Sequence, residues 1–74
     1  MYHTLRFRQN HELDLQVPGR PRLEKVLVHK GDRIEAQLRP FVREEEEGPV
    51  EMADLYLNGG GALLAVPMAA FCFE

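Results

Sequence analysis

The sequence predicts an all-β protein: a small, strongly curved antiparallel sheet or a closed barrel of five to seven short strands, with a one-turn 3₁₀ helix near the C-terminus. Two observations predict this class. Apolar and polar residues alternate with a period of two between turn signals, as they do in strands with one buried face. No stretch keeps a period of 3.6 over ten residues with capping residues at its ends. Because 74 residues form one domain at most, we expect a single small β-barrel domain over residues 1–74.

The first two strands are predicted over residues 2–9 and 12–17, where apolar side chains fall at every second position. The dipeptide Asn10-His11 between them reads as a turn. A two-residue connection between two such runs predicts a hairpin. The side chains expected to face the core are Leu5, Phe7, Leu13, Leu15 and Val17.

The next two strands are predicted over residues 23–29 and 33–39. The prolines and glycine of residues 18–21 break the chain before the first of them, and Lys30-Gly31-Asp32 is a turn between the two. Pro40 either ends the second ladder or lies on an edge, because proline has no backbone N–H to donate. Ile34, Ala36 and Leu38 are expected to face the core.

Residues 43–49 carry four glutamates followed by Gly-Pro and no apolar side chain, so they are predicted to form an exposed loop. A fifth strand is predicted over residues 50–57 and a sixth over residues 62–66. Asn58-Gly59 between them, flanked by apolar runs, is the strongest short-range hairpin signal. Ala53, Leu55 and Leu57 are expected on the core side, which makes Asp54 an outward-facing surface acid.

The C-terminal segment is predicted to turn once and then form a last strand. Pro67 ends the sixth strand, residues 68–70 suit a single 3₁₀ turn, and residues 71–73 form a short strand. This order, together with Lys30-Gly31-Asp32 before a strand, resembles the closing half of SH3-like barrels over roughly residues 25–73. The aromatic motif and the tryptophan of peptide-binding SH3 domains are missing, so proline-peptide binding is not implied. Other small barrels, including Sm-like rings, share the pattern.

The run from Ala62 to Phe73 is apolar everywhere except Pro67, although a strand with one wet face should alternate. A chain of 74 residues has little material with which to cover both faces. We therefore expect a homo-oligomer in which this run forms a subunit contact. The alternative is that the small alanines tolerate exposure and that the larger side chains are core. The interface side chains in this hypothesis are Leu63, Leu64, Val66, Met68, Phe71 and Phe73.

Charge is divided unequally along the chain. Residues 1–43 hold all nine Lys and Arg against five acids, whereas residues 44–74 hold seven acids and no basic residue. One interpretation is that the two halves interleave in the barrel and neutralise each other. The other is that two faces of opposite sign dock head to tail or meet charged partners.

Catalytic chemistry finds little support. The chain has no serine, which excludes a serine nucleophile, and Cys72 lies between two phenylalanines, which predicts an inert, buried thiol. Gly59–Gly61 reads as a hairpin turn because no Lys, Ser or Thr follows as in a phosphate-binding loop. The histidines lack the spacing of a local metal site, although His3 and His11 would face each other across the first hairpin. We expect no catalytic residue, cofactor or metal.

The sequence therefore favours a non-enzymatic small barrel that self-associates and acts as a protein-interaction or structural module. A single cysteine and no signal peptide predict a cytoplasmic protein, and the apolar run is too short for a membrane span. One alternative is a small enzyme or ligand-binding subunit with a site between chains. Another is a barrel that binds RNA or DNA, which the net charge of −3 disfavours. Its contacts would be Arg6, Arg8, Arg20, Arg22 and Lys25.

Overall fold

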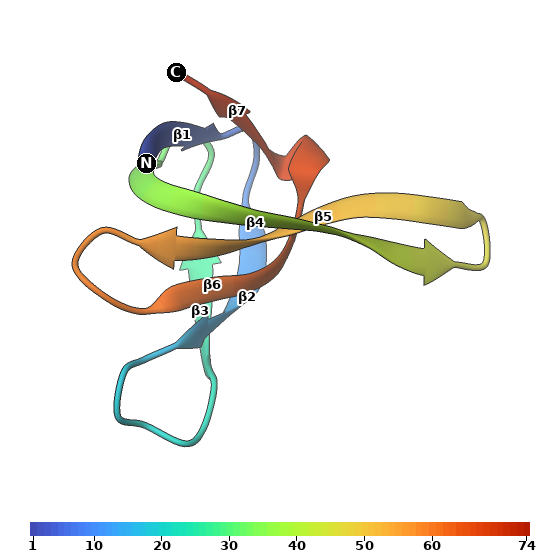
Figure 1. Ribbon diagram of the computed structural model, residues 1–74. Coiled ribbons are helices and arrows are strands. Elements are labelled where there is room, and N and C mark those ends of the chain that lie inside the picture. Colours follow the sequence, from blue (N-terminus) through green and yellow to red (C-terminus); the bar gives the residue numbers. More distant parts are fainter.

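A computed structural model describes all 74 residues as seven antiparallel strands in one curled sheet (Figure 1). The strand order is β3-β2-β6-β5-β4-β1-β7. The outer strands β3 and β7 do not pair with each other, so the sheet is a strongly curved half-barrel and not a closed barrel. The elements are β1 His3–Phe7, β2 His11–Gln16, β3 Glu24–Val28, β4 Arg33–Glu45, β5 Gly48–Leu57, β6 Ala62–Pro67, the 3₁₀ turn η1 Met68–Ala70 and β7 Phe71–Phe73.

The first two strands do not form the predicted hairpin. Strand β1 lies between β4 and β7, and β2 lies between β3 and β6. The connection is tied to the turn before β4: the side-chain oxygen of Asn10 accepts from the backbone N–H of Lys30 at 2.9 Å, and the N–H of Gly31 donates to the carbonyl of Phe7 at 2.8 Å. These bonds direct the two strands to different parts of the sheet.

The core draws side chains from every strand and from η1, as the predicted alternation requires. Leu5, Ala36 and Leu55 have no exposed surface. Most of the other inward-facing predictions are half-buried around them, and Val17 falls just beyond β2. The buried cluster consists of Leu5, Phe7, Leu13, Val28, Ala36, Ala53, Leu55, Leu63, Val66, Ala70 and Phe71.

A bulge in β6 explains why the C-terminal apolar run does not alternate. Strand β6 is internal, between β2 and β5. Ala53 pairs with Val66, but two residues later Leu55 pairs with Leu63, three residues away on β6. The extra residue turns the strand, so Leu63 and Val66 both reach the core. The chain itself therefore covers much of this apolar strand.

Asp54 holds that bulge in place. Its Oδ1 accepts a hydrogen bond from the backbone N–H of Ala65 at 2.8 Å in a partly buried position. Ala65 has φ of 51°, the left-handed region, where an L side chain is strained. Asp54 does point away from the core, as expected, but it is a structural acid and not a free surface charge.

The end of the chain forms as predicted. Met68–Ala70 makes one 3₁₀ turn after Pro67, and Phe71–Phe73 makes the last strand. The ring of Phe71 packs edge-on against that of Phe7, with centroids 6.3 Å apart. No helix in the structure has the length and hydropathy to cross a membrane.

Candidate functional site: the projecting arm

The outer half of the β4–β5 hairpin leaves the half-barrel as a two-stranded arm (Figure 1). We define the arm as residues 40–51 and the rest of the chain as the body. Strand β1 pairs with β4 only over Arg33–Ala36, and β6 pairs with β5 only from Met52 inward. Both edges of the arm are therefore unpaired.

The arm replaces the loop predicted over residues 43–49. The β4–β5 ladder continues to the pair Glu45↔Gly48, so only Glu46 and Glu47 form the turn. Gly48 follows with φ of 121°, which glycine adopts without the steric cost of a side chain. The prediction was wrong because it required apolar residues to bury, whereas a ribbon exposed on both faces keeps strand geometry through cross-strand hydrogen bonds alone.

The net negative charge of the chain lies on the arm. It holds one arginine against five glutamates, a net charge of −4, while the body holds eight Lys and Arg against seven acids, a net charge of +1. The only ion pair within the arm joins Arg43 and Glu45 at 4.0 Å. The glutamates are Glu44, Glu45, Glu46, Glu47 and Glu51.

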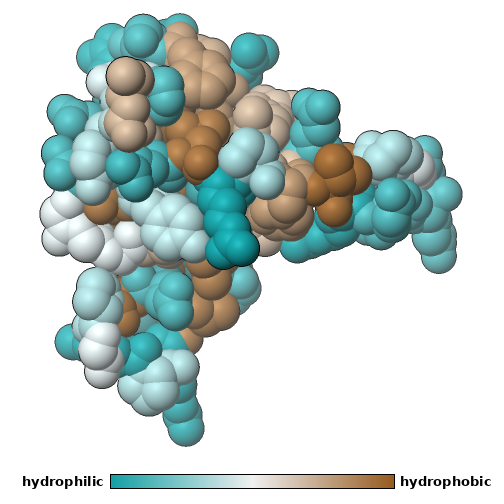
Figure 2. Space-filling view, viewed as in Figure 1, coloured by the Kyte–Doolittle hydropathy of each residue, from teal (hydrophilic) through white to brown (hydrophobic).

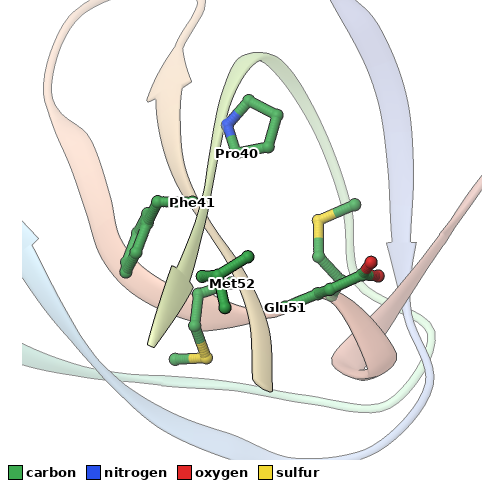
Figure 3. A pocket seen from close by; sticks show the side chains of 6 residues that line it. Pro40, Phe41, Glu51 and Met52 are labelled. Atoms are coloured by element: carbon green, nitrogen blue, oxygen red, sulfur yellow. The ribbon is translucent and has the colours of Figure 1, made fainter. Parts of the chain in front are cut away.

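An apolar groove of about 290 Å³ lies where the arm joins the body. Met52 forms its buried floor, and Phe41 and Met68 are half-buried beside it. Val42 is 57% exposed. Figure 3 shows the groove residues of both arm strands, with the Glu51 carboxylate directed away from the Phe41 ring. The lining residues are Pro40, Phe41, Val42, Glu51, Met52 and Met68.

Along the arm, exposed apolar residues lie near the base and acidic residues lie at the tip. Figure 2 shows a hydrophilic tip and a hydrophobic stretch between the tip and the body. Val42 and Val50 are both exposed on neighbouring strands. Prolines at positions 40 and 49, together with the glutamates, protect the open edges against strand addition. The arrangement therefore favours docking by side chains into the groove.

The six predicted interface residues separate into two groups. Leu63, Val66 and Phe71 are buried in the core of the single chain. Leu64 and Met68 are half-buried, and Met68 lines the groove. Phe73 is 55% exposed on β7. Among the six, only Leu64, Met68 and Phe73 have enough exposed surface to contact another chain, and the interface itself stays a prediction.

The five residues of the nucleic-acid alternative do not form one surface. Arg6 and Arg8 belong to β1 and the turn after it, whereas Arg20 and Arg22 lie in the β2–β3 loop at the opposite end of the body (Figure 1). Three of the five are in ion pairs: Arg6 with Glu74 at 3.2 Å, Arg20 with Glu24 at 2.9 Å and Lys25 with Asp14 at 2.7 Å. Only Arg8 and Arg22 carry unpaired charge.

The predicted histidine pair is also absent, because β1 and β2 are not neighbours. His3 contacts the edge of the Phe73 ring, with centroids 5.4 Å apart, and His11 hydrogen-bonds Gln9 at 3.2 Å. His29 approaches Asp32 at 3.7 Å. No three His, Cys, Asp or Glu side chains gather as a metal site would require.

Cys72 is partly exposed, contrary to the expectation of a buried thiol. Its Sγ accepts from the Arg6 guanidinium at 3.8 Å and donates to the Arg6 carbonyl at 3.7 Å. It alternates with core-facing Phe71 on a three-residue edge strand, so it faces outward.

Two side chains have pKa values raised by neighbours. A hydrogen bond and the charge of Asp14 raise the pKa of Lys25, and a hydrogen bond from Arg39 to Tyr56, with the charges of Tyr56 and Asp54, raises that of Arg39. Both side chains are exposed, and in each case a partner on the neighbouring strand stabilises the charged form. Neither creates a group that titrates near neutral pH.

Sequence reasoning missed the groove, although a signal was present. Phe41 and Val42 precede the acidic run, and Val50 and Met52 follow it, at positions nearly symmetric about Glu46-Glu47. Such symmetry predicts a hairpin that continues through the acidic segment. Comparison with protein-family models, with curated proteins and with solved structures finds no match to the chain.

Proposed function

We propose that the protein is a non-enzymatic interaction module with an SH3-like chain path, and that it self-associates through the groove at the base of its arm. The SH3-like assignment is supported by a first strand paired with both the fourth and the last, and by a 3₁₀ turn between the last two strands. A free thiol at Cys72 supports a reducing compartment such as the cytoplasm.

The groove is the observation that carries this proposal. A projecting ribbon has no apolar neighbour to cover Val42, and an isolated two-stranded ribbon is only marginally stable in water. Each square ångström of apolar surface removed from water contributes about 25 cal/mol, so covering the groove is favourable. Exposed apolar patches rimmed by charge are typical of protein contacts.

The experiment is light scattering after size-exclusion chromatography on the wild type and on Val42→Glu. We expect the wild type to exceed the 8.5 kDa of one chain and the variant to fall to it. The matched control is Leu27→Glu on β3, because Leu27 is also 57% exposed. A monomeric wild type, or dissociation by Leu27→Glu and not by Val42→Glu, would contradict the arm as the contact.

A further inference from the structure

Resting on the proposed self-association, we propose that the contact runs from arm to body: the acidic arm of one copy seats on the cationic end of a second copy, with Phe73 of the second copy entering the groove. The cationic end is defined by four residues that lie near the end of β1, in the turn after it, in the turn before β4 and at the start of β4. They are Arg6, Arg8, Lys30 and Arg33.

A contact between two arms is opposed by charge. Each arm carries −4, so pairing two arms would bring ten carboxylates together with only two arginines. Like charges placed opposite each other strongly disfavour an interface. The arm therefore requires a positively charged surface as its partner.

The body of the same protein supplies such a surface. Four acids of the arm, Glu44, Glu46, Glu47 and Glu51, have no ion-pair partner. On the body, Arg8, Arg22, Lys30 and Arg39 have none either. A second copy thus offers the charges that each copy leaves unmatched, without any other partner.

The cationic end is built by the ties between two turns. The bonds from Lys30 to Asn10 and from Gly31 to Phe7 join the turn after β1 to the turn before β4, which brings Arg8 and Lys30 to one end of the body. Arg6 and Arg33 are register partners across the β1–β4 pair.

This end keeps a surplus of positive charge. Arg6 and Arg33 both contact the Glu74 carboxylate, at 3.2 and 2.9 Å, so one acid serves two cations. Two more acids lie here: Asp32 accepts from the backbone N–H of His29 at 2.8 Å, and Glu35 lies two residues from Arg33 on the same face of β4. Four cations against three carboxylates leave a net charge of +1 toward an approaching arm.

Phe73 gives the same end an apolar anchor. It pairs in register with Leu5, so its ring lies on the core-side face of β7, opposite to the face that carries Arg6 and Cys72, and it is 55% exposed because the sheet stops at β7. Its ring matches a groove whose walls are Phe41, Val42 and Met68. Exposed aromatic side chains are common interface hot spots, and Phe73 lies on the edge strand whose other face borders Arg6.

The test combines two charge reversals on the full chain, with mass by light scattering as the readout. The arm variant is Glu46→Lys/Glu47→Lys and the body variant is Arg8→Glu/Lys30→Glu. All four positions are exposed, so both variants should fold, which circular dichroism verifies. We expect each variant alone to have the mass of one chain, and an equimolar mixture to form a complex containing both.

Two controls fix the interpretation. Arg20→Glu/Arg22→Glu makes the same charge change in the β2–β3 loop and should keep the wild-type mass. Phe73→Ala should shift the wild type toward monomer. If the wild type is an oligomer that Val42→Glu dissociates, but the body variant keeps its mass, self-association through the arm stands and the arm-to-body contact is overturned. A wild type that is monomeric overturns both.

Discussion

Two hairpins of one sheet, β5–β6 and β4–β5, differ in what covers their apolar side chains. Strand β6 is almost wholly apolar, but it lies between β2 and β5, and its bulge turns both Leu63 and Val66 inward. The arm is the most acidic part of the chain, yet it leaves Val42 and the groove open to solvent. Whether an apolar side chain is covered within the chain therefore follows from its position in the sheet and not from apolar content.

The largest expected effect is the difference in unfolding free energy lost by truncating a side chain in the body and one on the arm. Leu55→Ala removes a side chain with no exposed surface, so we expect the free energy of unfolding to fall by about 2–5 kcal/mol. Val42→Ala on the arm should change it by less than about 0.5 kcal/mol in the monomer. Urea denaturation at low protein concentration measures both. Equal losses would mean that the arm belongs to the cooperative core.

The bulge can be broken at Asp54. Asp54→Ala leaves the partly buried N–H of Ala65 without its acceptor, so we expect a loss of about 1–3 kcal/mol in unfolding free energy. Asp54→Asn keeps an acceptor oxygen and should lose less. Thermal and urea unfolding report the difference. An alanine variant as stable as the wild type would show that the bulge forms without this bond.

The same bulge can be relieved at Ala65. Because Ala65 has φ of 51°, Ala65→Gly removes side-chain strain and should raise the unfolding free energy by about 0.5–1 kcal/mol. Ala62→Gly, at a buried position on the same strand without positive φ, should instead destabilise the protein. Calorimetry on both variants checks the opposite signs. Destabilisation of both would argue against the left-handed conformation at Ala65.

The smallest effect is expected at the cationic end. Glu74→Gln removes the carboxylate shared by Arg6 and Arg33, and partly exposed ion pairs contribute at most about 1 kcal/mol. The variant should lower the unfolding free energy by less than that, and the difference should shrink in high salt. A loss several times larger would make Glu74 part of the core structure of the body.

Local sequence patterns predicted most of the strands and the β5–β6 hairpin, but not the partners of the first two strands. The period of two placed Leu5, Phe7 and Leu55 inward, and the proline and the small residues after β6 predicted η1. The pairing of β1 with β4 and β7 depends on contacts between distant residues, which alternation does not encode. Alternation and the short connection therefore predicted a first hairpin, whereas the distant contacts place β1 and β2 apart.

The candidate site was harder to predict for a related reason. The uniformly apolar composition of residues 62–73 indicated this segment as the contact. The bulge that buries Leu63 and Val66 is bonded to Asp54 on the neighbouring strand, and composition does not reveal such a contact. The groove joins residues from β4, β5 and η1, and only the curl of the sheet brings Met68 to the base of the arm. The charge asymmetry was visible in the sequence, and the structure assigns its acidic part to one projection.

The most direct measurement is hydrogen exchange by mass spectrometry as protein concentration increases. If the arm is the assembly surface, backbone amides of residues 40–51 should become protected with concentration, while those of β3 should not change. Protection should fade in high salt, because the contact depends on opposite charges. Rapid exchange in the arm at every concentration, or concentration-dependent protection confined to β3, would contradict the account.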